Sequence, residues 1–196
     1  MKKGRLEAFS NGVLAIIITI MVLEMKVPHG DHLSALAPLF PVVLSYILSF
    51  VYIGIYWNNH HHFMHAATHV NGKLLWANLH LLFWLSLIPL ATAWMGENHF
   101  AAATMAMYGF VLLMCSVAWQ PFQYALISAN GGSQGELARM IIGSRDWKGL
   151  LALLLYLIAI PMAFVSSWIS GLIYITVASM WLVPDRRIEG RNDTDS

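Results

Sequence analysis

The sequence predicts an all-α integral membrane protein in which six helices of each subunit cross the bilayer. Of its 196 residues, 58% are hydrophobic and 11% are charged, against roughly 25% charged residues in an average soluble domain. Apolar runs of about 20 residues, the length of a membrane-spanning helix, recur along the chain. A soluble domain of this size has too little interior to hide so much apolar surface. Water-soluble enzymes, nucleic-acid binders and disordered chains are therefore excluded.

The first four spans follow from the apolar runs. They are predicted at about residues 9–25, 38–58, 74–94 and 100–126. The connections between these spans are short, and the connection predicted at residues 59–72 is rich in histidine. No internal repeat and no separate soluble domain is expected.

Two further, shorter spans are predicted between Lys148 and Asp185, a stretch without charged residues. At about 1.5 Å per residue, one helix of that length would far exceed a hydrocarbon core of about 30 Å. The serines and the glycine of residues 166–171 are typical of a turn, which divides the stretch into spans at about 150–165 and 169–183. A re-entrant hairpin is the alternative for this pair.

The basic residues predict the orientation of the chain. With Lys2, Lys3 and Arg5 in the cytoplasm, six spans place every basic residue on that side except Lys26, as the positive-inside rule expects. Both termini are then cytoplasmic. Residues 1–185 are expected to form a single transmembrane domain, and residues 186–196 a polar cytoplasmic tail.

Charged side chains are missing from the middle of every predicted span. Ion-coupled carriers keep an ionisable group there, because coupling needs a group that titrates or binds an ion. The sequence therefore argues against a coupled pump. Its single cysteine, Cys115, also excludes an internal disulfide framework.

The first predicted helix sorts its residues onto distinct faces. At about 100° per residue, one stripe of this helix is apolar except for one hydroxyl, and it holds Phe9, Gly12, Ile16, Thr19, Ile20 and Leu23. Such a stripe is typical of lipid contact or helix packing. It also suits a pore lining, since hydrophobic constrictions gate and select ions by dewetting. A pore lining needs several copies, because one helix cannot surround a channel.

The residues at the start of this helix resemble a known signature. The segment RLEAFSNGV at residues 5–13 is similar to the RxxxFSD motif of the endolysosomal transmembrane potassium channel family, which includes single-repeat bacterial members. The following segment AIIITIMVLEMKVP, the segment YWNNHH at 56–61 and the segment LWANL at 75–79 also resemble the family. The resemblance covers residues 1–95 well, and the rest by hydropathy only.

The resemblance implies a passive, potassium-preferring cation channel rather than an enzyme. The family forms homotetramers of six-helix subunits in which the first helices line the pore, and it lacks the carbonyl-lined P-loop filter of other potassium channels. Carried over by offset, the hydrophobic constriction falls at Ile16, Thr19 or Ile20, and Leu23. Potassium ions in the pore, no cofactor, and a location in the bacterial inner membrane are further implications.

Polar residues of three spans are expected to meet at the cytoplasmic side. Unpaired polar groups are costly in lipid, so a structural network is predicted that anchors the first helix to its own subunit, formed by Arg5, Phe9, Ser10, Asn11, His60 and Asn78. The family's Asp is replaced by Asn11, which keeps a hydrogen-bond acceptor and loses the charge. Local or water partners for each residue are the alternative.

The dense histidines allow a second interpretation. His61, His65 and His69 are spaced by four residues, so one continuous helix would stack them on one face. Imidazole is a good ligand for zinc, copper and haem iron. Neither Cys nor an acidic residue accompanies the row, so no metal site is predicted. A haem- or metal-binding membrane redox protein that also uses His80, or a small-molecule carrier, is the alternative function.

Overall fold

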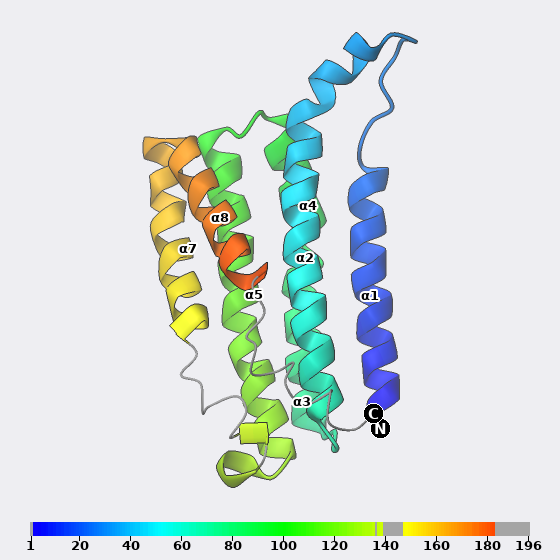
Figure 1. Ribbon diagram of the computed structural model, residues 1–196, viewed down its shortest axis with the longest axis vertical. Coiled ribbons are helices and arrows are strands. Elements are labelled where there is room, and N and C mark those ends of the chain that lie inside the picture. The colour runs from blue at the N-terminus through cyan, green and yellow to red at the C-terminus, as the bar shows by residue number, and fades with distance from the viewer. Residues whose placement is uncertain (1, 136, 139–146, 183–196) are drawn as a thin grey trace.

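The computed structural model describes residues 2–135, 137–138 and 147–182, and over this part of the chain all regular structure is helical (Figure 1). The predicted all-α class is confirmed. The elements in order are α1 (Lys3–Leu23), η1 (Leu33–Leu39), α2 (Phe40–Ala66), α3 (Gly72–Leu85), α4 (Ile88–Glu97), α5 (Ala102–Ala129), η2 (Gly132–Gln134), α7 (Trp147–Val165) and α8 (Ser167–Leu182).

Five helical segments are long and apolar enough to cross a membrane. They are residues 3–23, 33–66, 72–97, 102–129 and 147–165, and α8 is a shorter apolar helix of 16 residues. These segments overlap the predicted spans. The number of full crossings, the orientation and the single-domain boundary stay predictions, and the predicted tail at residues 186–196 lies outside the described residues.

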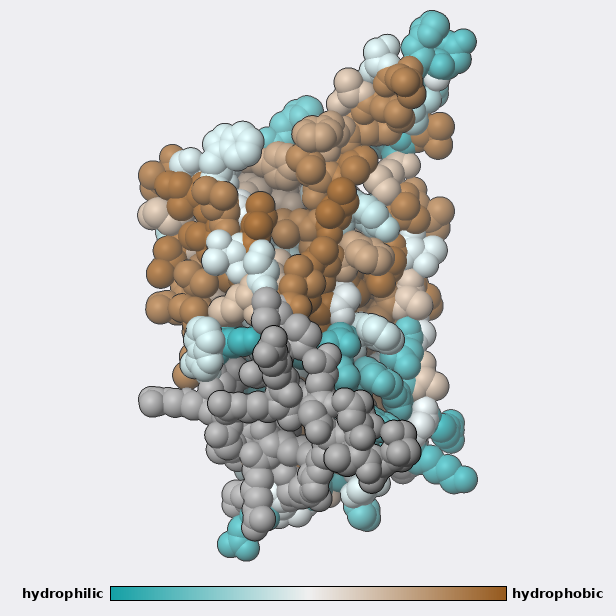
Figure 2. All heavy atoms as spheres, viewed as in Figure 1, coloured by the Kyte–Doolittle hydropathy of each residue, from teal (hydrophilic) through white to brown (hydrophobic). Residues whose placement is uncertain are grey.

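The helices form a bundle with α1 at one edge and the α7–α8 pair at the other (Figure 1). α1 packs against α2, α3 and α4, whereas α7 and α8 pack against each other and against α5. α1 begins, α2 ends and α3 begins at the bottom of the bundle in Figure 1. This end of the bundle is termed the lower end. Figure 2 shows hydrophobic side chains over most of the helical surface above that end, as a membrane-embedded bundle requires.

Two helix boundaries differ from the sequence-based expectation. α2 continues to Ala66, so the predicted loop at residues 59–72 is wrong for its first half. The segment 59–66 contains no Gly or Pro that would end the helix, and its residues keep a helical backbone. The third span is two helices, with α3 ending at Leu85 and α4 beginning at Ile88. Pro89 lies in the first turn of α4, where its missing N–H leaves no helical hydrogen bond broken.

Close helix contacts depend on glycine at two positions. A Cβ at Gly96 of α4 would lie 2.8 Å from the Cα of Val42 in α2, and a Cβ at Gly109 of α5 would collide with the Tyr174 side chain of α8. The hydroxyl of Tyr174 donates to the Met105 carbonyl at 2.9 Å. The absence of a side chain thus lets α4 approach α2 and lets α8 approach α5.

Asn130, directly after α5, joins the α2–α3 connection to α5 at the lower end. Its Oδ1 accepts hydrogen bonds from the backbone N–H groups of Thr68 and His69 at 2.7 and 2.8 Å. Its Nδ2 donates to the carbonyls of His69 and Leu126 at 3.2 and 2.8 Å. One amide side chain therefore satisfies backbone groups of two separate segments.

Replacing Asn130 by alanine is expected to lower the stability of the protein by about 1–3 kcal/mol, because two backbone N–H groups lose their acceptor. Thermal unfolding of the purified protein, followed by tryptophan fluorescence, measures the loss as a drop of several degrees in melting temperature. Asn98→Ala is the matched control, since it removes one hydrogen bond, to the Trp94 carbonyl. Equal melting temperatures for Asn130→Ala and wild type would contradict the assigned role.

Candidate functional site

α1 has one face inside the subunit and one face outside it. The inner face holds the buried residues Leu6, Ser10, Leu14, Ile17 and Met21. On the outer face, the exposed fractions are 52% for Phe9, 60% for Ile16, 41% for Ile20 and 74% for Leu23. The apolar stripe that the sequence grouped by periodicity is therefore left largely uncovered by the described residues of its own subunit.

Two smaller residues complete the outer face. Thr19 is exposed, and its hydroxyl donates to the Ala15 carbonyl at 2.8 Å, so the lone pairs of its oxygen are left for another group. A Cβ placed at Gly12 would meet no atom within 4 Å. Nothing in the described part of the subunit covers this face at either position.

An apolar groove runs beside the stripe, between α1 and the start of α4. Its volume is about 420 Å³, and its walls are mainly aliphatic, with Val13, Ile16, Ile17, Ile20, Glu24, Ser86, Pro89, Leu90 and Ala93 around it. Ile16 and Ile20 thus border both the outer face and the groove. Ser86, in the break between α3 and α4, is one of the residues that line it.

A buried chain of polar side chains anchors the inner face of α1. His60 Nε2 lies 2.8 Å from Asn78 Oδ1, and Asn78 Nδ2 donates to the Ser10 hydroxyl at 3.0 Å. The Ser10 hydroxyl donates in turn to the Leu6 carbonyl at 3.0 Å. All three side chains are buried. Because Asn78 Oδ1 accepts, this arrangement assigns the His60 proton to Nε2.

The other ring nitrogen of His60, Nδ1, and the face of the ring have different surroundings. Nδ1 is buried and has no hydrogen-bond partner in the described part of the chain. The ring stacks on Phe122 of α5, with centroids 5.1 Å apart. The chain Ser10–Asn78–His60 therefore links α1, α3 and α2, and the stacked ring extends the contact to α5.

A second set of contacts, termed here the α1–α2 clasp, fixes α1 nearer the surface. Lys3 Nζ donates to the His65 carbonyl at 2.8 Å, His61 Nδ1 lies 3.1 Å from Glu7 Oε1, and Trp57 Nε1 donates to Asn11 Oδ1 at 3.2 Å. The α1 partners are Lys3, Glu7 and Asn11, and the α2 partners are His65, His61 and Trp57. Each set is spaced by four residues and the two run antiparallel, so the clasp fixes the rotation of α1 as well as its position.

Three participants in the clasp were not among the predicted site residues: Lys3, Glu7 and Trp57. Spacing by four residues on both helices is the signal that pairs them, but only once the helices are known to be antiparallel neighbours. Asn11 still accepts a hydrogen bond, as its amide oxygen permits. The amide at this position therefore supplies the acceptor for Trp57 without a charge.

Two residues predicted for the network lie outside it. Arg5 is exposed, and its side chain makes no hydrogen bond or ion pair with the described residues. Phe9 lies on the outer face of α1 with the apolar stripe. The described structure thus brings Ser10, His60 and Asn78 together, joins Asn11 to Trp57, and leaves Arg5 and Phe9 apart.

The histidine row does not form as one helical face. α2 ends at Ala66, so His69 leaves the row, and the premise that one helix stacks His61, His65 and His69 is wrong. His61 and His65 do stack, with centroids 6.1 Å apart, but His61 Nδ1 faces Glu7. His80 accepts a hydrogen bond from Trp84 Nε1 at 3.0 Å. Within the described ranges, no three metal-ligating side chains cluster.

An ion pair joins the other end of α1 to α4. Lys26 Nζ lies 2.7 Å from Glu97 Oε1, and both side chains are exposed. The hydrogen bond and the charge of Glu97 raise the pKa of Lys26 above its ordinary value. The raised pKa keeps Lys26 charged at neutral pH, and the stability that the pair contributes is lost as the pH rises through that pKa. Exposed pairs contribute little stability, so this contact mainly orients the connection after α1.

Comparison with known proteins gives consistent matches. A family model described as "Endosomal/lysosomal potassium channel TMEM175" matches residues 5–89. A potassium channel of Chryseobacterium sp. (strain P1-3) is 49% identical over 189 residues, which cover 96% of this chain and 97% of that protein. A potassium channel of Chamaesiphon minutus is 30% identical and covers 85% of this chain, with 87% of its own length matched.

A solved structure has the same arrangement of helices. The crystal structure of a lysosomal potassium-selective channel TMEM175 homolog from Chamaesiphon minutus superposes with a TM-score of 0.79 at 26% identity. The match covers 94% of this chain and 97% of that chain. The similarity therefore extends beyond residues 5–89 to the helices after them.

Proposed function

The chain belongs to the TMEM175 family of potassium channels, and we propose that it conducts potassium ions passively through a pore lined by the outer faces of several α1 helices. Membership of this family makes the chain a membrane potassium channel and not an enzyme. The same comparisons support neither the haem- or metal-binding redox protein nor the small-molecule carrier.

The observation that carries the pore assignment is the uncovered apolar face of α1. Ile16, Ile20 and Leu23 are large, exposed and aligned along the helix, and the face is held at a defined rotation by Ser10–Asn78–His60 and by the α1–α2 clasp. A pore helix needs a fixed rotation of this kind, because each ring of side chains must point at one axis.

Several copies must assemble to enclose a path. One α1 helix cannot surround an ion, so the site is complete only in an oligomer, and we propose the homotetramer that the resemblance implies. Each α1 then contributes one Ile16, one Thr19, one Ile20 and one Leu23 to the lining. The groove between α1 and α4 gives the neighbouring copy an apolar surface beside that lining.

The proposed constriction selects by partial dehydration. Aliphatic rings at Ile16, Ile20 and Leu23 offer no oxygen ligand, so an ion that passes them sheds part of its water without replacement. Potassium holds its water less tightly than sodium, and the barrier is therefore lower for potassium. The Thr19 oxygen, whose lone pairs are not used within its hydrogen bond to Ala15, is the one polar ligand that the stripe supplies.

The proposed orientation places the lower end of the bundle in the cytoplasm. The basic residues Lys2, Lys3, Arg5 and Lys73 lie at the helix starts of that end, which agrees with the positive-inside rule. The network and the clasp then lie at the cytoplasmic mouth, and the Lys26–Glu97 pair lies at the opposite mouth. A bacterial inner membrane is the proposed location, with potassium ions in the pore and no cofactor.

Ion flux through the purified, reconstituted protein tests this function. Liposomes containing the protein are expected to conduct a potassium current that persists without any other substrate, and the potassium permeability should exceed that of sodium. Protein-free liposomes are the control. Saturable uptake without current would indicate the carrier instead, and a Soret band or stoichiometric metal in the purified protein would indicate the redox protein.

A further inference from the structure

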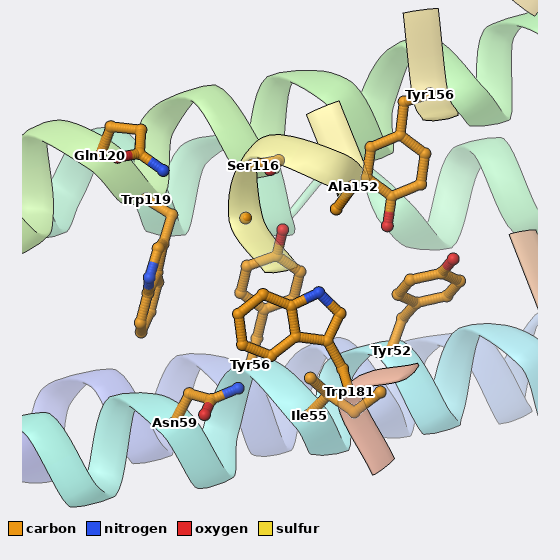
Figure 3. A pocket seen from close by; sticks show the side chains of 11 residues that line it. Tyr52, Ile55, Tyr56, Asn59, Ser116, Trp119, Gln120, Ala152, Tyr156 and Trp181 are labelled. Atoms are coloured by element: carbon orange, nitrogen blue, oxygen red, sulfur yellow. The ribbon is translucent and has the colours of Figure 1, made fainter. Parts of the chain in front are cut away.

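A small cavity lies between α2, α5, α7 and α8, away from the face that α1 presents to the outside (Figure 3). Its walls include the aromatic residues Tyr52, Tyr56, Trp119, Tyr156 and Trp181. None of the 11 lining residues carries a charge. The cavity volume is about 30 Å³, whereas roughly 10–15 Å³ holds one water molecule.

Polar groups in this cavity are left without protein partners. Tyr56 of α2 and Ser116 of α5 lie on facing walls (Figure 3), and neither hydroxyl forms a hydrogen bond within the described part of the chain. Ser116 is only 8% exposed. Asn59 and Gln120 also line the cavity (Figure 3), but Gln120 is exposed and Asn59 is only partly buried, so their amides can reach solvent outside it.

Buried hydroxyl groups elsewhere in the subunit are paired. Tyr52 donates to the Tyr174 carbonyl at 2.6 Å, and Tyr174 donates to the Met105 carbonyl at 2.9 Å. Ser49 Oγ lies 2.9 Å from the hydroxyl of Tyr108. The subunit thus satisfies its interior hydroxyls where helices meet directly, and the unpaired hydroxyls of Tyr56 and Ser116 occur where space separates them.

We propose that this cavity is a binding site for ordered water, holding about two molecules that bridge α2, α5 and α7. Without water, the hydroxyls of Tyr56 and Ser116 would face the cavity with no hydrogen-bond partner among the described residues, which is unfavourable for a polar group away from bulk solvent. A neutral hydrogen-bonding molecule of this size satisfies them. Neutral water is assigned to the site because none of the described lining residues carries a charge. The proposal rests on residues that the pore assignment does not use.

Radiolytic hydroxyl-radical labelling of the full-length protein tests this site. Internal water generates radicals locally, so a buried side chain beside water is modified faster than an equally buried side chain in a dry core. Tyr52 and Tyr156 line the cavity and are 2% and 3% exposed, whereas Tyr108 and Tyr174 are fully buried outside it. The lining pair is expected to be labelled several-fold faster than the other pair, and equal rates would overturn the proposal.

A cavity-filling substitution supplies a second measurement. Ala152 of α7 is buried and lines the cavity, so the larger side chain of Ala152→Leu occupies the volume assigned to water. Labelling of Tyr52 and Tyr156 is expected to fall toward the rate of Tyr108 and Tyr174. Unchanged labelling in a folded Ala152→Leu protein would contradict the site. If that variant does not fold, the comparison within the wild-type protein still decides.

Discussion

Replacing Ile16 by asparagine is expected to let sodium pass the channel about as readily as potassium. The substitution places amide groups in the proposed constriction, and these replace part of the water that an ion loses there. The dehydration barrier then falls most for the more strongly hydrated ion. A tenfold rise in the sodium-to-potassium permeability ratio corresponds to a change of about 1.4 kcal/mol between the two barriers.

Bi-ionic reversal potentials in reconstituted membranes measure this ratio. Leu23→Ala provides an independent variant, because Leu23 is the most exposed large residue of the stripe, at 74%, and its truncation widens the same path. Val22→Asn is the matched control. Val22 is also exposed on α1, but it lies about 120° around the helix from Ile16. The sodium-to-potassium permeability ratio of Val22→Asn should therefore equal that of wild type. An unchanged ratio in both Ile16→Asn and Leu23→Ala would remove these residues from the selectivity barrier.

Replacing Asn78 by leucine is expected to cause the largest loss of stability. The substitution leaves His60 Nε2 without an acceptor and Ser10 without the donor at 3.0 Å, and both side chains are buried. Unsatisfied buried polar groups cost about 1–3 kcal/mol each, so a loss of roughly 2–5 kcal/mol follows. Because the same contacts orient α1, potassium flux through any protein that still folds should fall as well.

Thermal unfolding and liposome flux on the same preparation test both parts of this expectation. Asn58→Leu is the matched control, because Asn58 is exposed on α2 and its side chain has no hydrogen-bond partner among the described residues. Asn78→Asp has nearly the same shape as the wild-type side chain. It keeps the acceptor for His60 and loses the donor to Ser10, so it tests the second hydrogen bond without a change of packing. A melting temperature equal to that of wild type in Asn78→Leu would show that the chain Ser10–Asn78–His60 does not anchor α1.

The placement of single residues shows where local sequence information ends. Ser10 and Asn78 are 68 positions apart, as their hydrogen bond records, and nothing local to either residue specifies the other. The clasp has the same property, because Glu7 meets His61 only once α1 and α2 lie antiparallel at one particular rotation. The end of α2 at Ala66 and the division of α3 from α4 were missed because helix ends depend on competition between backbone hydrogen bonds and tertiary contacts.

The membrane class, the approximate position of each apolar helix and the stripe on α1 can be read from the amino-acid sequence. These properties follow from the hydropathy and periodicity of consecutive residues, which a lipid environment converts directly into helices. Three features become visible only in the folded chain: which polar groups pair, that Asn130 joins two segments, and that a cavity lies between Tyr56 and Ser116. Pairing across helices depends on their rotation, register and spacing, and these are set by the packing of the whole chain rather than by any one stretch of it.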